Sequence, residues 1–335
     1  AWDVEVVLTG NTLDTGTTLE AVHGAVTSRG TWDGRRAEII GQLDIDSLKI
    51  LGYELTHVRG PYEFSGSQLY VGSPAAFSPR VQAIPLTDRI TANAIGGQLT
   101  FDAAVRFDEE TAYNLKLYLS QGQLEEYARR YMAGARSLRG IMTGWVDLHG
   151  TGTTVDDMKG RGQFRIRPAA LYELPVIAQV LKVMVLSPPD KTAFNYAFTD
   201  FTVGNSRFNF NVIDLVGDTI TLRGRGTAGF DGKLNIEFFS MLSRKQLSIP
   251  LLGALVGQFT TGWIGVEVTG DVRKSETKIK PGLQIDEAMK RFLGSFEARQ
   301  PAAVPRLTIP PIRGRPRGIP TTNPNAPRRN IPRRP

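Results

Sequence analysis

The amino-acid sequence predicts a mostly β protein, a long antiparallel meander with short helices laid against it. Apolar residues alternate with polar ones over short runs, which is the period of a strand with one buried and one wet face. Gly, Asn-Ser or Asp-Gly separates these runs, as tight turns between strands require. Helical stretches are absent between most of the runs, so the strands are expected to pair antiparallel rather than to form a parallel α/β sheet.

Residues 1–120 are predicted to form successive short strands. Turns are expected at Gly10-Asn11, at Asp33-Gly34 and at the Ser-Gly-Ser sequence before Leu69. The alternating apolar residues of these strands are Val4, Val6 and Leu8; Val22 and Val26; Leu43 and Ile45; Tyr53 and Leu55; Leu69 and Val71; Leu99, Phe101, Ala103, Val105 and Phe107; and Leu115, Leu117 and Leu119.

The stretch from Ile141 to Phe239 continues this pattern around one apolar helix. Further strands are expected near Met142–Leu148, near Phe164–Ile166 and over Phe194–Val203, Arg207–Val212, Thr219–Arg225, Leu234–Phe239 and Trp263–Val272. Apolar residues at spacings of three and four predict an amphipathic helix over Gln123–Arg136. Helices are also expected within Leu171–Leu186, Leu247–Phe259 and Ile285–Phe296.

Composition excludes several classes of site. The chain of 335 residues has no Cys, which rules out disulfides, thiolate metal sites and cysteine nucleophiles. Residues 301–335 hold eight Arg and no acid, so the formal net charge of +7 falls to −1 for residues 1–300. A nearly neutral body argues against a specific nucleic-acid-binding domain, which would carry its own basic face. The Pro-rich and Arg-rich tail is expected to be disordered.

No apolar run reaches the length of about 18 residues that would predict a membrane span. The chain starts inside an apparent strand, AWDVEVVL, without an initiator Met or a signal peptide. We therefore expect a piece of a longer protein, with any signal or membrane anchor upstream of Ala1.

Glycine and hydrophobic patterns in the second half resemble the C-terminal module of the AsmA-like family, the AsmA/TamB/YhdP-type envelope proteins of Gram-negative bacteria. The similar segments are Met158–Ile166 (MKGRGQFRI), a following apolar helix, and Leu222–Leu234 (LRGRGTAGFDGKL), with IGVEVTGDVRKSETKIKP as the closing strand. The resemblance covers about residues 141–281. Where the family has Asp-Gly after the first strand, this chain has Arg167-Pro168-Ala169-Ala170, so that turn must be built differently.

The resemblance implies an elongated, curved antiparallel sheet with an apolar inner groove. Together with the composition, it divides the chain into a β-rich groove segment (1–140), the AsmA-like module (141–299) and the disordered basic tail (300–335), which is not part of the family pattern. It also implies a periplasmic, non-enzymatic protein tethered to the inner membrane that shelters or conveys phospholipid toward the outer membrane. Burial of acyl chains in a groove is favourable by about 0.8 kcal/mol per CH₂.

Thirteen apolar residues of the second half are the candidates for lining a lipid groove: Met142, Val146, Leu148, Phe164, Ile166, Phe208, Phe210, Val212, Ile220, Leu222, Leu234, Ile236 and Phe238. The same alternation would also suit the closed core of a β-sandwich, because alternation indicates which face is apolar but not what covers it. The apolar helix within Leu171–Leu186 would then be either a plug of the groove or a packed core helix.

Sequence patterns of catalysis and of metal binding are lacking. His23, His57 and His149 are far apart and have no metal-ligand spacing, and no nucleophile elbow, zinc helix or P-loop motif occurs. The acids Asp44, Asp46, Asp156 and Asp157 are interpreted as wet-face or turn residues rather than as a glycosidase pair or calcium ligands. The Gly160-Arg161-Gly162 and Gly224-Arg225-Gly226 sequences are interpreted as turn or bulge glycines. We expect no catalytic residue, metal or cofactor.

Three functions remain open at this stage. The first is the lipid-sheltering envelope protein, with phospholipid acyl chains as ligand and the Arg-rich tail on an anionic envelope surface. The second is a structural or adhesive β-rich surface module without lipid transport. The third is a carbohydrate-active β protein. The tail itself could be a solvated end, an anchor for anionic head groups or cell-wall polymers, or a non-specific nucleic-acid contact.

Overall fold

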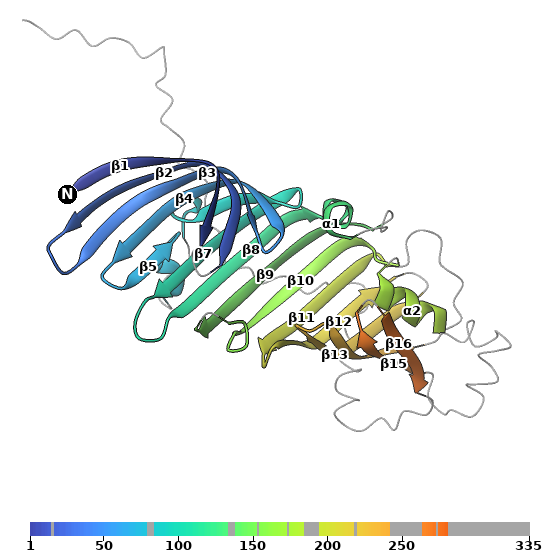
Figure 1. Ribbon diagram of the computed structural model, residues 1–335. Helices are drawn as coiled ribbons and strands as arrows, with labels where there is room; N and C mark the ends of the chain where they lie inside the picture. Colours follow the sequence, from blue (N-terminus) through green and yellow to red (C-terminus); the bar gives the residue numbers. More distant parts are fainter. Residues whose placement is uncertain are drawn as a thin grey trace, which may run out of the picture.

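A computed structural model shows one antiparallel sheet of sixteen strands, with two short α-helices on one side (Figure 1). It describes residues 1–14, 17–78, 84–132, 138–152, 154–172, 174–183, 194–217, 220–241, 263–272 and 274–280. The strands are β1 (Trp2–Asp14), β2 (Thr18–Trp32), β3 (Ala37–Ile50), β4 (Tyr53–Ser65), β5 (Gln68–Val71), β6 (Ile90–Ala94), β7 (Gly97–Arg106), β8 (Ala112–Gln123), β9 (Arg139–Thr151), β10 (Lys159–Ala170), β11 (Tyr196–Gly204), β12 (Arg207–Val216), β13 (Thr221–Gly229), β14 (Lys233–Met241), β15 (Trp263–Asp271) and β16 (Lys274–Lys280).

The strand order in space follows the order in sequence, so the predicted meander is confirmed. The one departure lies between β4 and β7, where β5 and β6 share a single strand position. β5 pairs with one half of β4 and β7, and β6 pairs with the other half. Pairing between β8 and β9 carries the sheet without a break past residue 140, where the sequence suggested a division.

The first α-helix is shorter than predicted, and the second begins later than predicted. The first, α1, spans Leu124–Tyr131, and the second, α2, spans Pro175–Val183. The Tyr131 ring of α1 lies 4.9 Å from the Tyr53 ring, and its hydroxyl accepts a hydrogen bond from the Glu54 backbone N–H. These contacts fasten α1 over the end of β4. In the described part of the chain, no helix is long and apolar enough to cross a membrane.

Buried apolar side chains form two clusters along the sheet. The N-terminal cluster joins β1–β4 to β6–β8 around Val22, Ile45, Val58 and Ile90. The C-terminal cluster joins α1 and α2 to β11–β15, with Val180, Leu222 and Phe238 fully or almost fully buried. The strands between the clusters therefore have no covering layer of described residues, unlike the strands of a β-sandwich.

Two sequence predictions for the first and last strands need correction. Gly10-Asn11 is not a turn, because β1 continues to Asp14 with register shifts on both sides of Asn11. Gly10 has φ +83°, a left-handed conformation that suits a β-bulge. The last strand, β16, was not predicted as a strand of its own, since KSETKIK has little apolar alternation.

The glycines of the two Gly-Arg-Gly sequences also differ from prediction. Gly160 and Gly162 lie in the regular ladder of β10, with neither turn nor bulge. Gly224 and Gly226 of β13 flank a register shift in β12, so for them the bulge interpretation is close to correct. The helices expected in 247–259 and 285–296, the end of the 171–186 helix and the disordered tail lie outside the described residues.

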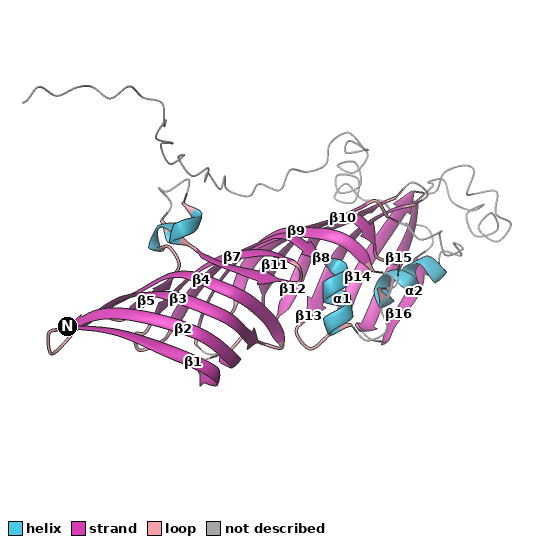
Figure 2. Cartoon of the chain, turned by 90° about the horizontal axis from the view of Figure 1, so that it is seen from above, coloured by secondary structure: helices cyan, strands magenta, loops and turns pink. Residues whose placement is uncertain are grey.

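Between β5 and β6, the described residues 72–78 and 84–89 lie on the side of the sheet opposite to α1 and α2 (Figure 2). They contain the short 3-10 helices η1 (Pro74–Phe77) and η2 (Leu86–Asp88). Asp102 of β7 receives a hydrogen bond from the Ser73 backbone N–H at 2.9 Å and one from Arg89 Nε at 2.7 Å. The side chains of Arg89 and Asp102 are only 7% and 0% exposed, so this buried carboxylate holds both described ranges against β7.

We predict that Asp102→Asn lowers the free energy of unfolding by about 3 kcal/mol, because it leaves the buried guanidinium of Arg89 without its counter-charge. Asp44→Asn is the matched control. Asp44 also pairs with an arginine, Arg59, but both side chains are more than half exposed, and such pairs contribute at most about 1 kcal/mol. Urea unfolding of the two variants measures both values, and equal losses would contradict the bracing role of Asp102.

A close packing of rings over glycines accompanies the curvature of the sheet. A Cβ atom at Gly162 would lie 2.6 Å from the Phe201 ring and 2.7 Å from the Trp145 carbonyl oxygen. Similar contacts place the Phe164 ring over Gly144 and the Phe238 ring over Gly224. Glycine on one strand thus makes room for a large side chain from the next strand on the same face.

Gly162→Ala is therefore expected to lower the free energy of unfolding by about 1–3 kcal/mol, the usual range for overpacking. Gly204→Ala serves as control, since Gly204 ends the neighbouring strand β11 and a Cβ there would meet no atom within 4 Å. Urea titrations of both variants test the difference. A neutral Gly162→Ala would show that the Phe201 ring is free to move away.

Candidate functional site: the apolar inner face

The pairing register separates the side chains of the sheet into an inner face, which carries α2, and an outer face. One column of directly opposed residues crosses every strand except β6 on the inner face. Its members are Val4, Ser28, Gly41, Tyr62, Val71, Ala103, Leu115, Leu148, Gly160, Val203, Phe208, Ala228, Leu234, Gly270 and Ser275. No charged side chain occurs in this column.

The adjacent column on the outer face has the opposite character. From β7 to β16 its members are Asp102, Lys116, Asp147, Arg161, Thr202, Asn209, Thr227, Asn235, Thr269 and Glu276. Every one of them is polar or charged. The period of two therefore keeps its phase across these two columns. Elsewhere the outer face is not wholly solvated, because Phe198 of β11 and Phe239 of β14 are buried on it beside Asp214 and Arg223.

Ion pairs on the outer face join neighbouring strands. Arg29 binds Asp3, Arg59 binds Asp44, and Lys280 binds both Glu237 and Glu267 at 2.6 and 3.2 Å. The hydrogen bond to Glu237 raises the pKa of Lys280 above its ordinary value. Solvated pairs of this kind let one face of a single-layered sheet remain in water while the other face is apolar.

The thirteen predicted groove residues lie on or beside the inner face, with one exception. Val212 is opposite Asp200, which shares the outer face with Gln163. A bulge in β12 places one extra residue between Phe210 and Ile213, so Ile213 rather than Val212 points inward. The prediction that Phe208, Phe210 and Val212 share the inner face is therefore wrong for Val212.

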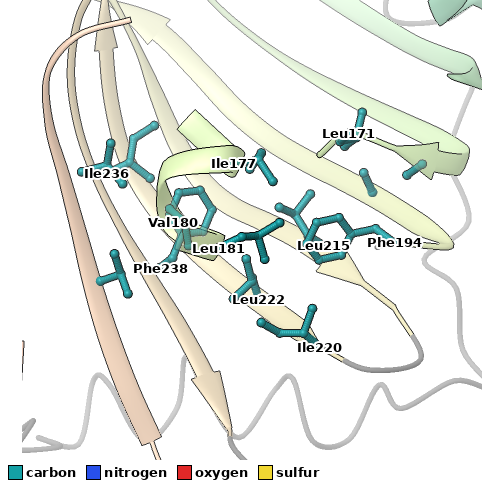
Figure 3. Packing of buried hydrophobic residues seen from close by; sticks show 14 of the residues in the cluster. Leu171, Ile177, Val180, Leu181, Phe194, Leu215, Ile220, Leu222, Ile236 and Phe238 are labelled. Carbon is teal, nitrogen blue, oxygen red and sulfur yellow. The ribbon is translucent and has the colours of Figure 1, made fainter. Parts of the chain in front are cut away.

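Helix α2 covers the predicted residues at the C-terminal end. Figure 3 shows Ile177, Val180 and Leu181 of the helix packed toward the sheet. Beneath the helix lie Ile220, Leu222, Ile236 and Phe238, which are at most 5% exposed. These four residues form a dry core and have no surface left for a ligand.

Leu234 is buried in the C-terminal cluster, Ile166 and Phe210 pack against it, and Met142 packs against the N-terminal cluster. Four further predicted residues are partly exposed between the two clusters. Val146, Leu148, Phe164 and Phe208 come from three different strands and are each half-buried. Rings extend this surface: Phe164 stacks on Phe201 at 6.0 Å, Phe201 meets Phe208 edge-on at 5.6 Å, and Phe230 meets Phe208 at 5.3 Å. Edge-to-face rings at these separations are favourable aromatic contacts.

Several residues of this face were missed as site candidates. Phe201 and Phe230 belong to it, as do Leu115 and Leu117 of β8 and the inner residues of β1–β5. The inner face of β7, with Leu99, Phe101 and Val105, was visible in the sequence as a possible groove face. Phe198 and Phe201 are three residues apart and lie on opposite faces. Phe198 is directly opposite Asp214 on the outer face, whereas Phe201 is opposite Gly162 on the inner face. The alternation of Leu115, Leu117 and Leu119 was visible in the sequence and was the available signal for β8.

The residues considered for other chemistry are dispersed. Asp44 pairs with Arg59, Asp156 accepts a hydrogen bond from the Ser206 hydroxyl, and His149 is exposed on the outer face. His57 lies 3.4 Å from the Asn93 amide nitrogen. Within the described residues, no group of three His, Cys, Asp or Glu side chains is placed to hold a metal ion.

Comparisons of the chain with known protein families, with curated proteins and with solved structures found no match. The chemistry of the inner face is therefore the basis for a functional proposal.

The phase change in β12 predicts different responses at two adjacent residues. Ile213→Asn should lower the free energy of unfolding by about 2–4 kcal/mol, because it places an amide in the C-terminal cluster. Val212→Asn should cost less than about 1 kcal/mol, since its amide would lie beside Asp200 in a polar environment. Urea unfolding measures both, and a larger loss at Val212 would reverse the assignment of faces.

Proposed function

We propose that this chain is a non-enzymatic envelope protein that shelters or conveys phospholipid acyl chains along the inner face of its sheet, between inner and outer membranes. The observation that carries the proposal is the inner column, in which no charge interrupts fifteen successive strand positions. An acyl chain needs an uncharged surface and no directed hydrogen bonds, and this face offers both.

The length of the face suits transfer rather than the binding of one small ligand. Neighbouring strands are about 4.8 Å apart, so fifteen strand positions extend for about 67 Å along the sheet. The hydrocarbon core of a bilayer is about 30 Å thick. The face is thus longer than an acyl chain by several fold, and successive lipids could occupy it at once.

Shelter of this kind lowers the cost of moving lipid through water without chemistry. Each CH₂ removed from water is worth about 0.8 kcal/mol, or on the order of 10 kcal/mol for a fully buried chain of about sixteen carbons. A sheet face covers one side of the chain, so the gain is a fraction of this value. Partial shelter also favours function, because a lipid that is held too strongly would not leave.

Helix α2 sets one limit of the lipid surface. It fills the inner face over β13–β15, so acyl chains would occupy the strands before it. The order of elements around it, a strand with Gly160 and Gly162, a helix and a strand pair, is the order that the AsmA-like resemblance implies. A periplasmic location, an inner-membrane tether and a role in outer-membrane assembly are part of the same proposal and rest on that resemblance.

A structural or adhesive surface module is the second candidate. The observation in its favour is the exposure of β1, where Val4, Val6 and Val7 are 45%, 49% and 67% exposed. Among the described strands, β1 pairs only with β2, so its other edge could take a strand from a partner. Such a module would hold no lipid.

Photo-crosslinking at two adjacent residues of β9 distinguishes the two functions. A benzophenone amino acid at position 148 replaces a half-buried inner residue, whereas at position 149 it replaces an exposed outer residue. We expect a phospholipid adduct by mass spectrometry at Leu148 and at most a trace at His149. The same strand and hairpin carry both probes, so the difference reports the face alone.

Native mass spectrometry of the full chain, purified without detergent, provides the second readout. Bound phospholipid together with the adduct at position 148 supports lipid transfer. Lipid-free protein with no adduct at either position would overturn it and leave the surface module as the better description.

A further inference from the structure

Strand β10 carries a row of basic side chains on the outer face. Lys159, Arg161, Arg165 and Arg167 alternate with the inner residues Gly160, Gly162, Phe164 and Ile166. Residues two apart on a strand are separated by about 7 Å. The four basic residues therefore project along one line, with Gln163 filling the position between Arg161 and Arg165.

The row differs from four arginines in the N-terminal half of the chain. Arg29, Arg59, Arg89 and Arg106 each contact a carboxylate. In contrast, Lys159, Arg161 and Arg167 are exposed, and within the part of the chain that the structure describes no carboxylate lies within 4 Å of their charged groups.

The acids on the neighbouring strands do not neutralise this row. Asp147 of β9 is opposite Arg161 in register but makes no ion pair with it among the described contacts. Asp200 of β11 accepts hydrogen bonds from Gln163 and Asn211 instead.

Aromatic and aliphatic side chains flank the unpaired cations. The Arg161 guanidinium lies 5.7 Å from the centre of the Trp145 ring, and that of Arg167 lies 5.3 Å from the Tyr196 ring. These rings come from β9 and β11, one on each side of β10. Ile141, directly opposite Arg167, is 43% exposed. Tyr196 is itself buried, so the accessible groups of the row are the cations, the partly exposed Trp145 ring and Ile141. Cations beside Trp and an exposed aliphatic residue are the composition that suits a membrane interface.

We propose that the outer surface of β9 and β10 docks on the anionic head groups of a phospholipid bilayer, with Lys159, Arg161 and Arg167 as the phosphate contacts. This surface is distinct from the acyl-chain surface and from the Arg-rich tail, and the proposal does not depend on lipid being carried on the inner face. A bilayer is favoured over a nucleic acid because the row is a single line of charge beside an exposed aliphatic side chain, Ile141.

The test uses the full chain with its eight tail arginines replaced by Gln, so that the charge of the tail does not set the affinity. Binding to phosphatidylcholine vesicles with and without phosphatidylglycerol is measured by co-sedimentation. Because each basic residue near an anionic surface contributes a roughly fivefold factor, Arg161→Gln with Arg167→Gln should weaken binding to the anionic vesicles about 30-fold.

Arg29→Gln with Arg59→Gln is the matched control, because it removes the same charge from exposed outer-face arginines that already have partners. It should weaken binding less than about threefold. Arg161→Lys with Arg167→Lys should retain most of the binding, which a purely structural role of the two arginines would not predict. Circular dichroism confirms that each variant is folded.

Equal losses for the test and control pairs would overturn the proposal, as would equal binding to neutral vesicles. Tighter binding of a DNA oligonucleotide or of polyphosphate, with the same dependence on Arg161 and Arg167, would assign the surface to another polyanion and overturn the membrane assignment. The crosslinking result at Leu148 is independent of all these outcomes.

Discussion

The phase of the side-chain alternation is the constraint on which the rest of this molecule depends. A strand presents its residues alternately to two faces, so pairing must place apolar residues opposite apolar ones from each strand to the next. The register does this from Val4 in β1 to Ser275 in β16. Where a bulge shifts the alternation by one residue, the spacing of inward apolar residues becomes three instead of two. Ile45 and Leu48 are three residues apart and both are buried. Phe210 and Ile213 are also three apart, and both pack against the C-terminal cluster.

The two faces of this single layer are stabilised in different ways. On the inner face, large side chains lie over glycines of the next strand, and helix α2 covers only the C-terminal part. On the outer face, exposed ion pairs join neighbouring strands, and the buried Arg89–Asp102 pair holds the described residues between β5 and β6 against β7. The outer side chains of Phe198 and Phe239, in β11 and β14, are buried. A sandwich would hide one face of each sheet in a common core. Here most of the stability comes from neighbouring strands, which leaves an apolar surface available for a ligand.

Much of this fold was predictable because period-two alternation is a local property of the sequence. The strands of both halves, the hairpin at Asp33-Gly34 and the amphipathic character of α1 follow from it. The errors arose where backbone geometry intervenes. The bulges at Gly10 and in β12 do not alter composition, so Val212 was placed on the wrong face. In β16 the inner positions hold Ser275 and Thr277 instead of apolar residues, so the sequence there did not predict a strand. The alternation could not predict which inner apolar residues stay exposed, because that depends on where α2 packs.

The sequential strand order has a consequence for how such a protein is made and how it changes. Each strand contacts mainly the strands that precede and follow it in the chain, as neighbouring units do in repeat proteins. A sheet of this kind can form hairpin by hairpin as the chain leaves the ribosome, without waiting for its C-terminal end. Insertion or loss of one hairpin would lengthen or shorten the sheet by two strand spacings, about 10 Å, and leave the remaining pairs intact. The distance that the molecule spans is thus a property that evolution can adjust in regular steps.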